Sequence, residues 1–170
     1  MKKIITTLLI TSLSAFSINI GEIPPIATID KENGGRIDGT AFSSKMIKDK
    51  VYVMFYVDPD EKDTNNDFSE ALKAKNYSHD KFGSIAVINL KATWLPNFVL
   101  ENILKSKQEE YPDTIYVKDK IKYLVQGWNL ADDSSDILLF NKKGELIYSY
   151  AGKMDSTEIE KALKLIDENL

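Results

Sequence analysis

The sequence predicts an α/β fold in which a mixed central sheet is flanked by helices. Apolar runs at residues 51–57 and 85–90 show no polar alternation, which is typical of central strands covered on both faces. A segment with the periodicity of an amphipathic helix follows each run. The chain then ends in a β-hairpin over residues 136–150 and a helix over residues 155–170, so the alternation of strands and helices closes in a mixed sheet.

The first half of the chain supplies one short strand, one long strand and one helix. Residues 26–29 can form a short strand after two prolines, whereas the glycine-rich residues 31–39 have the composition of turns. After the strand at residues 51–57, Thr64 and Asp67 have the spacing of a capping box. We therefore expect a helix from Thr64 to about residue 76.

The second half repeats this pattern. Trp94 and Pro96 open a second predicted helix, with Trp94 in the core. We expect an inward-facing stripe on this helix, a strand over residues 114–119 and a short helix over residues 123–126. The terminal helix has Asp155 as its cap and Glu158 at its third position. The residues of the predicted inward stripe are Phe98, Val99, Asn102 and Ile103.

The N-terminus has the pattern of a cleaved secretory signal peptide over residues 1–17. Lys2 and Lys3 precede an apolar run without charges, and small residues lie around Ser17. The run is shorter than the roughly 20 residues of a transmembrane helix, although an uncleaved anchor remains the alternative. We expect an exported protein whose residues 18–170 form a single domain.

Charge and residue composition exclude several functional classes. Loss of Lys2 and Lys3 with the leader would change the net charge from −4 to −6, which disfavours nucleic acid and anionic membranes as partners. The chain has no cysteine, so it forms no disulfide and carries out no thiol chemistry. His79 is the only histidine and lies in a polar segment, so we expect a surface residue without a catalytic or transition-metal role.

Four segments resemble known proteins. "GEIPP" (residues 21–25) is similar to the opening of exported thioredoxin-like and peroxiredoxin-like proteins, and the strand at residues 51–57 lies where thioredoxins carry Cys-x-x-Cys. "EYPDTIYVKD" (residues 110–119) and "GWNLADDSSDILLFNKKGELIYS" (residues 127–149) resemble the YtfJ family of bacterial periplasmic proteins. The resemblance covers residues 20–170. It implies a thioredoxin-like fold and a periplasmic location, but no established activity.

The same resemblance implies where a ligand would bind. In thioredoxins, the Cys-x-x-Cys loop and the loop before a cis-proline form a groove that holds an extended peptide. Here Asp58 and Pro59 stand in the first loop and Ser135 stands near the proline position, so both redox hallmarks are missing. We expect a protein without thiol redox activity that binds a protein, peptide or small molecule. The predicted ligand-binding residues are Asp58, Pro59, Trp128, Ser134 and Ser135, with a core position as the alternative for Trp128.

The acidic loop after residue 57 admits two further interpretations. Asp58 and Asp60 have the spacing of haloacid-dehalogenase-type phosphatases, so a divalent-metal-dependent hydrolase is the alternative function. Lys62 stands where such enzymes carry Thr or Val, and the pair Asp132-Asp133 precedes its strand instead of ending it. Calcium binding by the loop acids conflicts with Lys62 at a ligand position, and helix capping accounts for acids there. The sequence therefore predicts no metal site and no cofactor. The loop acids in question are Asp58, Asp60, Asp63 and Asp67.

Overall fold

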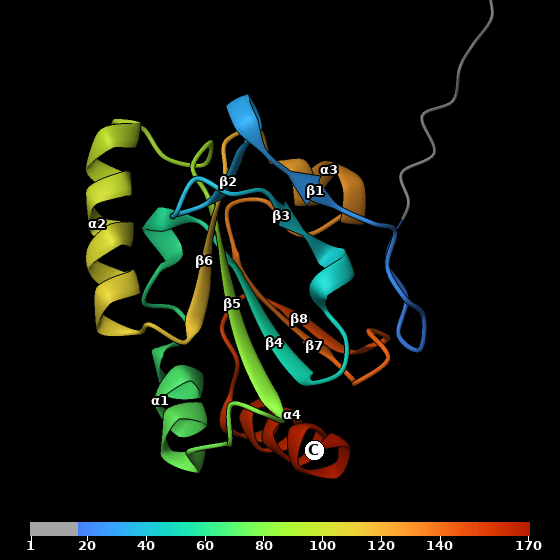
Figure 1. Cartoon of the computed structure of the whole chain (residues 1–170). Coiled ribbons are helices and arrows are strands. Elements are labelled where there is room, and N and C mark those ends of the chain that lie inside the picture. Colours follow the sequence, from blue (N-terminus) through green and yellow to red (C-terminus); the bar gives the residue numbers. More distant parts are fainter. Residues whose placement is uncertain (1–16) are drawn as a thin grey trace, which may run out of the picture.

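The computed structural model describes residues 17–170 and contains a six-stranded mixed sheet with helices on both faces (Figure 1). The strand order is β2-β6-β5-β4-β7-β8. The pairs β4-β5 and β5-β6 are parallel and the other three pairs are antiparallel, which confirms the predicted mixed sheet. The strands are β2 (Gly34–Arg36), β4 (Val51–Val57), β5 (Phe82–Asn89), β6 (Thr114–Asp119), β7 (Ser135–Phe140) and β8 (Leu146–Ala151).

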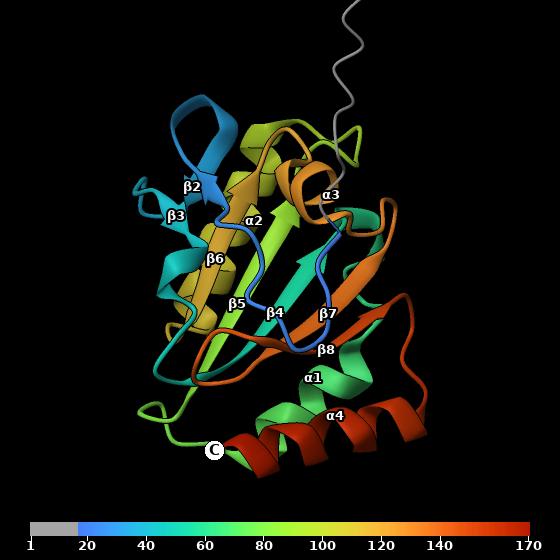
Figure 2. The same ribbon diagram turned by 90° about the vertical axis from the view of Figure 1, so that its right-hand side faces the viewer.

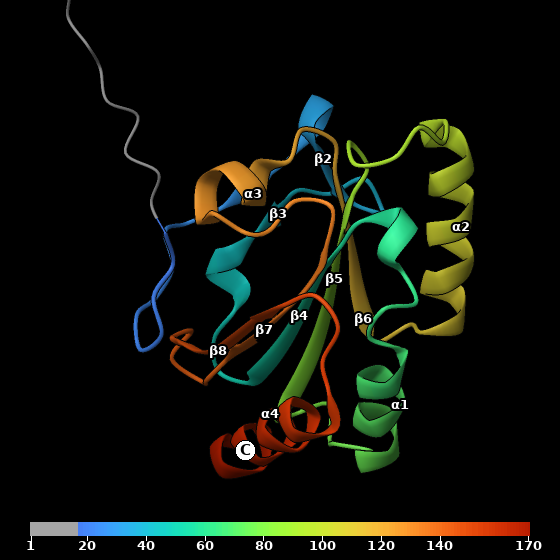
Figure 3. The same ribbon diagram turned by 180° about the vertical axis from the view of Figure 1, so that it is seen from behind.

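Three helices cover one face of the sheet, and α3 with the N-terminal segment covers the other (Figure 3). A small second sheet pairs β1 with β3 beside α3. Within residues 17–170, no helix is both long and apolar enough to cross a membrane. The predicted leader lies outside the described residues, apart from Ser17. The remaining strands and α-helices are β1 (Thr28–Ile29), β3 (Phe42–Ser43), α1 (Asn66–Lys75), α2 (Asn97–Glu110), α3 (Tyr123–Trp128) and α4 (Ser156–Asn169), and the 3-10 turn after β4 is η3 (Pro59–Glu61).

Strand β4 contributes to both major hydrophobic cores, because alternate side chains of a strand point to opposite faces. On one face Met54 packs in the cluster that contains Leu124 of α3. On the other face Val53 packs in the cluster that contains Phe68 of α1 and Ile166 of α4. The prediction of a strand covered on both sides is confirmed.

Strand β2 differs from the sequence prediction, which assigns residues 31–39 to turns. Gly34 pairs with Asp119 of β6 and has a φ of 129°. A Cβ atom on Gly34 would lie 1.9 Å from the carbonyl oxygen of Lys118, so only glycine allows this approach of the two backbones. The glycines that indicate a turn in the sequence serve a strand at the edge of the sheet.

Helix α1 begins at Asn66, one residue later than the predicted cap at Thr64 implies. Asn65 occupies the cap position, but its side chain makes no capping hydrogen bond. The Thr64 hydroxyl donates a hydrogen bond to Glu61 instead of to the helix. Asn65 is buried and bonds to distant backbone groups, as described below. Tertiary contacts have therefore replaced the local capping box that the spacing predicts.

Helix α2 turns a different face to the sheet from the one predicted. Leu100 and Leu104 are buried in a cluster with Leu90, whereas Phe98 is 67% exposed and Ile103 is 47% exposed. The helix carries apolar residues around more than half of its circumference, so its sequence alone does not select the buried side. The prediction of an inward stripe through Phe98 and Ile103 is wrong.

The C-terminal hairpin and helix match the prediction closely. Strands β7 and β8 pair across a turn in which Gly144 has a φ of 84°. The Asp155 carboxylate accepts a hydrogen bond from the backbone N–H of Glu158 at 2.9 Å, which caps α4. Figure 2 shows α4 lying beneath the hairpin, where Ile166 is buried with Tyr148 of β8.

Candidate functional site

Buried polar side chains gather where the three parallel strands end. Asp58 follows β4, Asn89 ends β5 and Asp119 ends β6, and none of the three is more than 1% exposed. Because these strands are parallel, their carboxyl ends meet at one edge of the sheet, where α/β proteins commonly bind ligands. Ser135 begins the antiparallel strand β7, opposite Val57 at the same edge.

Asp58 and Ser134 bind each other through two hydrogen bonds. The backbone N–H of Asp58 donates to the carbonyl of Ser134 at 3.0 Å, and the backbone N–H of Ser134 donates to Oδ2 of Asp58 at 3.0 Å. The Asn89 amide lies close enough to lower the pKa of the Asp58 carboxyl, but no donor of normal geometry reaches the buried Oδ1. The structure thus brings together two of the predicted site residues and leaves one buried carboxylate oxygen without a partner.

Asp132 and Asp133 lie beside Asp58, and ligand oxygens of the three carboxylates are all within 4.8 Å of one another. Lys122 is an ion-pair partner of this cluster, with Nζ 2.5 Å from Oδ2 of Asp132. Asp60 is outside the cluster, and its carboxylate accepts a hydrogen bond from Thr93 at 3.4 Å. The hydrolase alternative, which pairs Asp58 with Asp60, gains no support from this arrangement.

The pKa values of Asp58 and Asp132 are shifted in opposite directions. Burial raises the pKa of Asp58, and the charges of Asp132 and Asp133 raise it further. The hydrogen bond from Lys122 lowers the pKa of Asp132 and raises that of Lys122. The negative charge of Asp58 is therefore less stabilised than that of Asp132.

Ser135 is buried and serves the structure of the loop. Its Oγ accepts a hydrogen bond from Nδ2 of Asn65 at 3.0 Å, and its exposed fraction is 2%. Ser134 is half-buried, and its hydroxyl donates to Asp136 at 3.0 Å. The peptide bond that precedes Ser135 is trans. Of the predicted pair of serines, Ser134 alone reaches the surface, so Ser135 is not placed to touch a ligand.

Trp128 also lies in the core and not in the wall of a groove. Its exposed fraction is 2%, and its ring packs against Phe140 with centroids 6.2 Å apart. The indole N–H donates a hydrogen bond to the carbonyl of Pro25 at 2.8 Å. The predicted contact between Trp128 and a ligand does not fit this burial, because the ring offers almost no free surface.

Trp94, and not Trp128, is the exposed tryptophan. It is 87% exposed, although the sequence predicts it in the core. Its neighbour Thr93 bonds to Asp60 in the η3 turn, which follows Asp58 and lies beside α2 in Figures 1 and 3. Pro59 is half-buried at the start of this turn. We call Asp58, Pro59, Trp94 and the loop of residues 132–134 the Asp58 face.

Asp119 is a buried polar residue that sequence reasoning did not single out. It accepts hydrogen bonds from the Tyr56 hydroxyl at 3.2 Å and from the backbone N–H groups of Tyr123 and Leu124 at 2.9 and 3.2 Å. The Asp119 carboxylate therefore fixes the start of α3. The loop that carries Asp132 and Asp133 follows this helix in the chain. One sequence feature could have identified Asp119 and Asn89: each is a polar residue at the end of an apolar strand.

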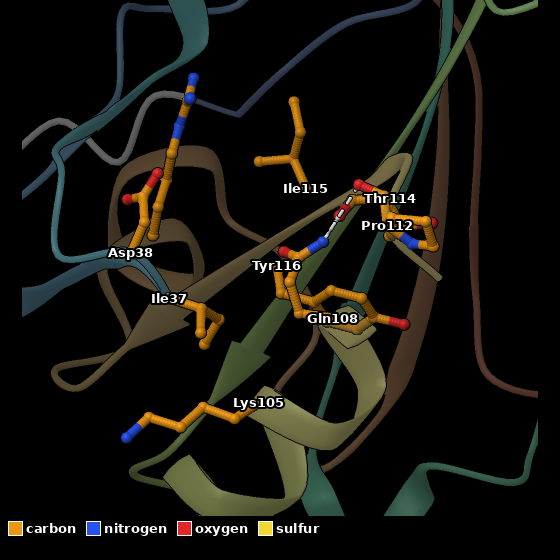
Figure 4. A pocket seen from close by; sticks show the side chains of 9 residues that line it. Ile37, Asp38, Lys105, Gln108, Pro112, Thr114, Ile115 and Tyr116 are labelled. Atoms are coloured by element: carbon orange, nitrogen blue, oxygen red, sulfur yellow. Dashed lines mark hydrogen bonds between the residues drawn. The ribbon is translucent and has the colours of Figure 1, made fainter. Parts of the chain in front are cut away.

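Two hollows of the described chain lie away from the Asp58 face. The larger, of about 420 Å³, lies where the start of β6 meets α2 and the segment after β2 (Figure 4). Gln108 points across it and donates a hydrogen bond to the Thr114 carbonyl at 2.9 Å. The second, of about 310 Å³, adjoins Tyr148 and Tyr150. Neither contains a predicted site residue.

The sheet order, the terminal hairpin and helix, and the polar loop after β4 define a protein of thioredoxin-like fold that lacks cysteine. A thiol-disulfide isomerase from Corynebacterium glutamicum is similar with a TM-score of 0.59 and 15% identity, covering 84% of this chain and 95% of that chain. ScoI of Bradyrhizobium japonicum, with copper bound, is similar with a TM-score of 0.60 and 16% identity, covering 88% and 100%. Identities this low show the fold alone.

The chain belongs to the family described as "Bacterial protein of unknown function (YtfJ_HI0045)", whose model matches residues 24–169. The uncharacterized protein YtfJ of Escherichia coli (strain K12) is 22% identical over 166 residues, which cover 92% of this chain and 90% of the relative. The predicted family and the predicted thioredoxin-like fold are both confirmed.

Proposed function

We propose that this chain is an exported, periplasmic binding protein of thioredoxin-like fold that holds a protein segment at the Asp58 face without thiol redox chemistry. The observation that carries the proposal is the exposure of Trp94, whose neighbour Thr93 bonds to Asp60 in the turn that follows Asp58, together with the cluster of three carboxylates at Asp58. A large exposed aromatic ring next to localised charge is typical of a surface that binds another molecule.

Thiol exchange has no chemical basis in these residues. A thioredoxin-type reaction needs a thiolate at the end of the strand that corresponds to β4. Asp58 stands there, and the 170 residues contain no cysteine. In place of a reactive thiol, the fold has the Asp58 face at this position. Binding of another molecule is therefore the function that the site supports best.

The shape and charge of the face favour a protein segment as the ligand. Hollows of about 420 and 310 Å³ lie elsewhere on the described chain, and enclosed cavities are the usual sites for small molecules. Trp94 offers apolar area, and the cluster of Asp58, Asp132 and Asp133 has Lys122 as its ion-pair partner. A segment with an apolar side chain next to Lys or Arg complements both features.

Export is tested with a reporter that works only outside the cytoplasm. A fusion of the full chain to alkaline phosphatase should be active in whole cells, because that enzyme needs disulfides that form in the periplasm. Removal of residues 1–17 should abolish this activity, since Lys2, Lys3 and the following apolar run supply the leader pattern. An inactive fusion of the full chain, produced in normal amounts, would contradict export.

Binding is tested by selecting ligands from a random peptide library on the purified chain. We expect the selected peptides to carry an apolar residue beside Lys or Arg, and to bind more weakly as salt concentration rises. Trp94→Ala should weaken the dissociation constant by about tenfold or more, as the loss of an aromatic anchor does. Isothermal titration calorimetry gives the constant for each variant.

The matched control is Ile103→Ala, which removes another exposed apolar side chain, on helix α2. Its affinity for the selected peptides should equal that of the wild type. Peptides that bind Trp94→Ala as tightly as wild type would place the contact elsewhere and refute the Asp58 face. Failure to select any peptide of the stated composition would refute the proposed ligand class.

A further inference from the structure

We propose that Asp58, Asp132 and Asp133 form a binding site for a hard divalent cation of the Ca²⁺ or Mg²⁺ type. Ligand oxygens of the three side chains lie within 4.8 Å of one another. Ca²⁺ binds oxygen at about 2.3–2.6 Å, so oxygens on opposite sides of one ion lie about 5 Å apart. One ion can therefore contact all three carboxylates with little movement of the loop, and water would complete its coordination.

The unpartnered oxygen of Asp58 is the second observation that points to a ligand. Asp58 is 1% exposed, and Oδ1 is buried without a hydrogen bond. Buried polar atoms are nearly always paired, and an orphaned one commonly marks an unseen water or ion. The other oxygen, Oδ2, is fixed by the N–H of Ser134, which holds the carboxylate beside the cluster.

The charges around Asp58 call for a cation. Asp132 and Asp133 are exposed neighbours of Asp58. Of the three carboxylates, only Asp132 forms an ion pair with Lys122. Three carboxylates and one ammonium leave two negative charges in a small volume when all are ionised. A divalent ion neutralises this excess and offsets the cost of an ionised, buried carboxylate.

The donor atoms select the class of ion. The cluster consists of carboxylate oxygens, which suit Ca²⁺, Mg²⁺ and Mn²⁺, and it contains neither sulfur nor imidazole. His79 is exposed, as predicted, with Nδ1 3.6 Å from Asp113, and is not part of the cluster. Ca²⁺ tolerates irregular geometry better than Mg²⁺ does, so we expect tighter binding of Ca²⁺.

The cation would compete with the Lys or Arg of the proposed peptide for the same carboxylates, so the test of the cation site contains no peptide. The purified chain is treated with a chelator and then titrated with CaCl₂ or MgCl₂ while thermal unfolding is recorded. We expect wild type to gain about 5–10 °C in Tm at a Ca²⁺ concentration near 100 times the dissociation constant. The gain should be lost in Asp58→Asn and in Asp133→Asn, which remove one charged ligand each.

Two further variants distinguish this site from non-specific binding of Ca²⁺ to an acidic protein. Asp60→Asn makes the same charge change just outside the cluster and should keep the full gain. Lys122→Gln removes the ammonium that competes for Asp132, so it should tighten Ca²⁺ binding by several-fold. An equal gain in wild type and Asp58→Asn, or no gain in wild type, would overturn the site.

Discussion

Replacing Trp128 by alanine is expected to lower the free energy of unfolding by about 3–5 kcal/mol. The substitution leaves a cavity against Phe140, because the ring is buried where α3 meets the sheet. It also leaves the Pro25 carbonyl without the indole donor that holds the N-terminal segment at 2.8 Å. Urea unfolding followed by circular dichroism measures the change without relying on tryptophan fluorescence.

The other tryptophan provides the matched control. Trp94→Ala deletes the same number of atoms from a side chain that is 87% exposed, so the free energy of unfolding should change by less than about 0.5 kcal/mol. The pair of variants thus separates a core tryptophan from a surface tryptophan in one experiment. Similar losses in both would mean that Trp94 is packed and that the proposed binding face is wrong.

Replacing Asn65 by alanine is expected to cost about 2–4 kcal/mol of folding free energy. Nδ2 donates to Ser135 and to the Gly152 carbonyl at 3.0 Å, and Oδ1 accepts from the Met154 N–H at 2.9 Å. The variant leaves the Gly152 and Met154 groups without this partner in a largely buried region, and unpaired buried groups are costly. The same urea titration gives the value.

The neighbouring Asn66→Ala is the control for this effect. Asn66 is exposed at the start of α1, and its amide makes one long hydrogen bond, of 3.3 Å, to Asp63. Its loss should change the free energy of unfolding by less than about 0.5 kcal/mol. If Asn65→Ala were equally mild, the three-way contact would contribute little, and α1 would be held by its apolar face alone.

Elements with a strong local signal were predicted correctly from the sequence. Strand β4 is apolar throughout, the hairpin has Gly144 at its turn, and α4 has the Asp155 cap, so neighbours in the chain determine each of them. Strand β2 and the buried face of α2 depend on what lies across from them. In the sequence Gly34 indicates a turn, and only its contact with Lys118 shows that it belongs to a strand. Either apolar side of α2 could be buried, and contact with the sheet decides which one is.

The candidate site was predictable in part for the same reason. Asp58 and Ser134 follow from the position of β4 and from the start of β7, which the order of the elements supplies. The approach of Asp132 and Asp133 to Asp58 joins residues more than 70 positions apart, and no local pattern encodes it. The exchange of roles between the two tryptophans has the same origin, because hydrophobicity alone does not decide which of them is covered.

Oxygen in place of sulfur at the end of β4 removes thiol redox chemistry from this position of the fold. Asp58 binds Ser134 through hydrogen bonds that no oxidant or reductant alters, and no cysteine is present to be trapped in a mixed disulfide. The Asp58 face therefore keeps one covalent state whether its compartment is oxidising or reducing. It requires no partner to supply electrons, so we expect binding at this face to be independent of the redox potential.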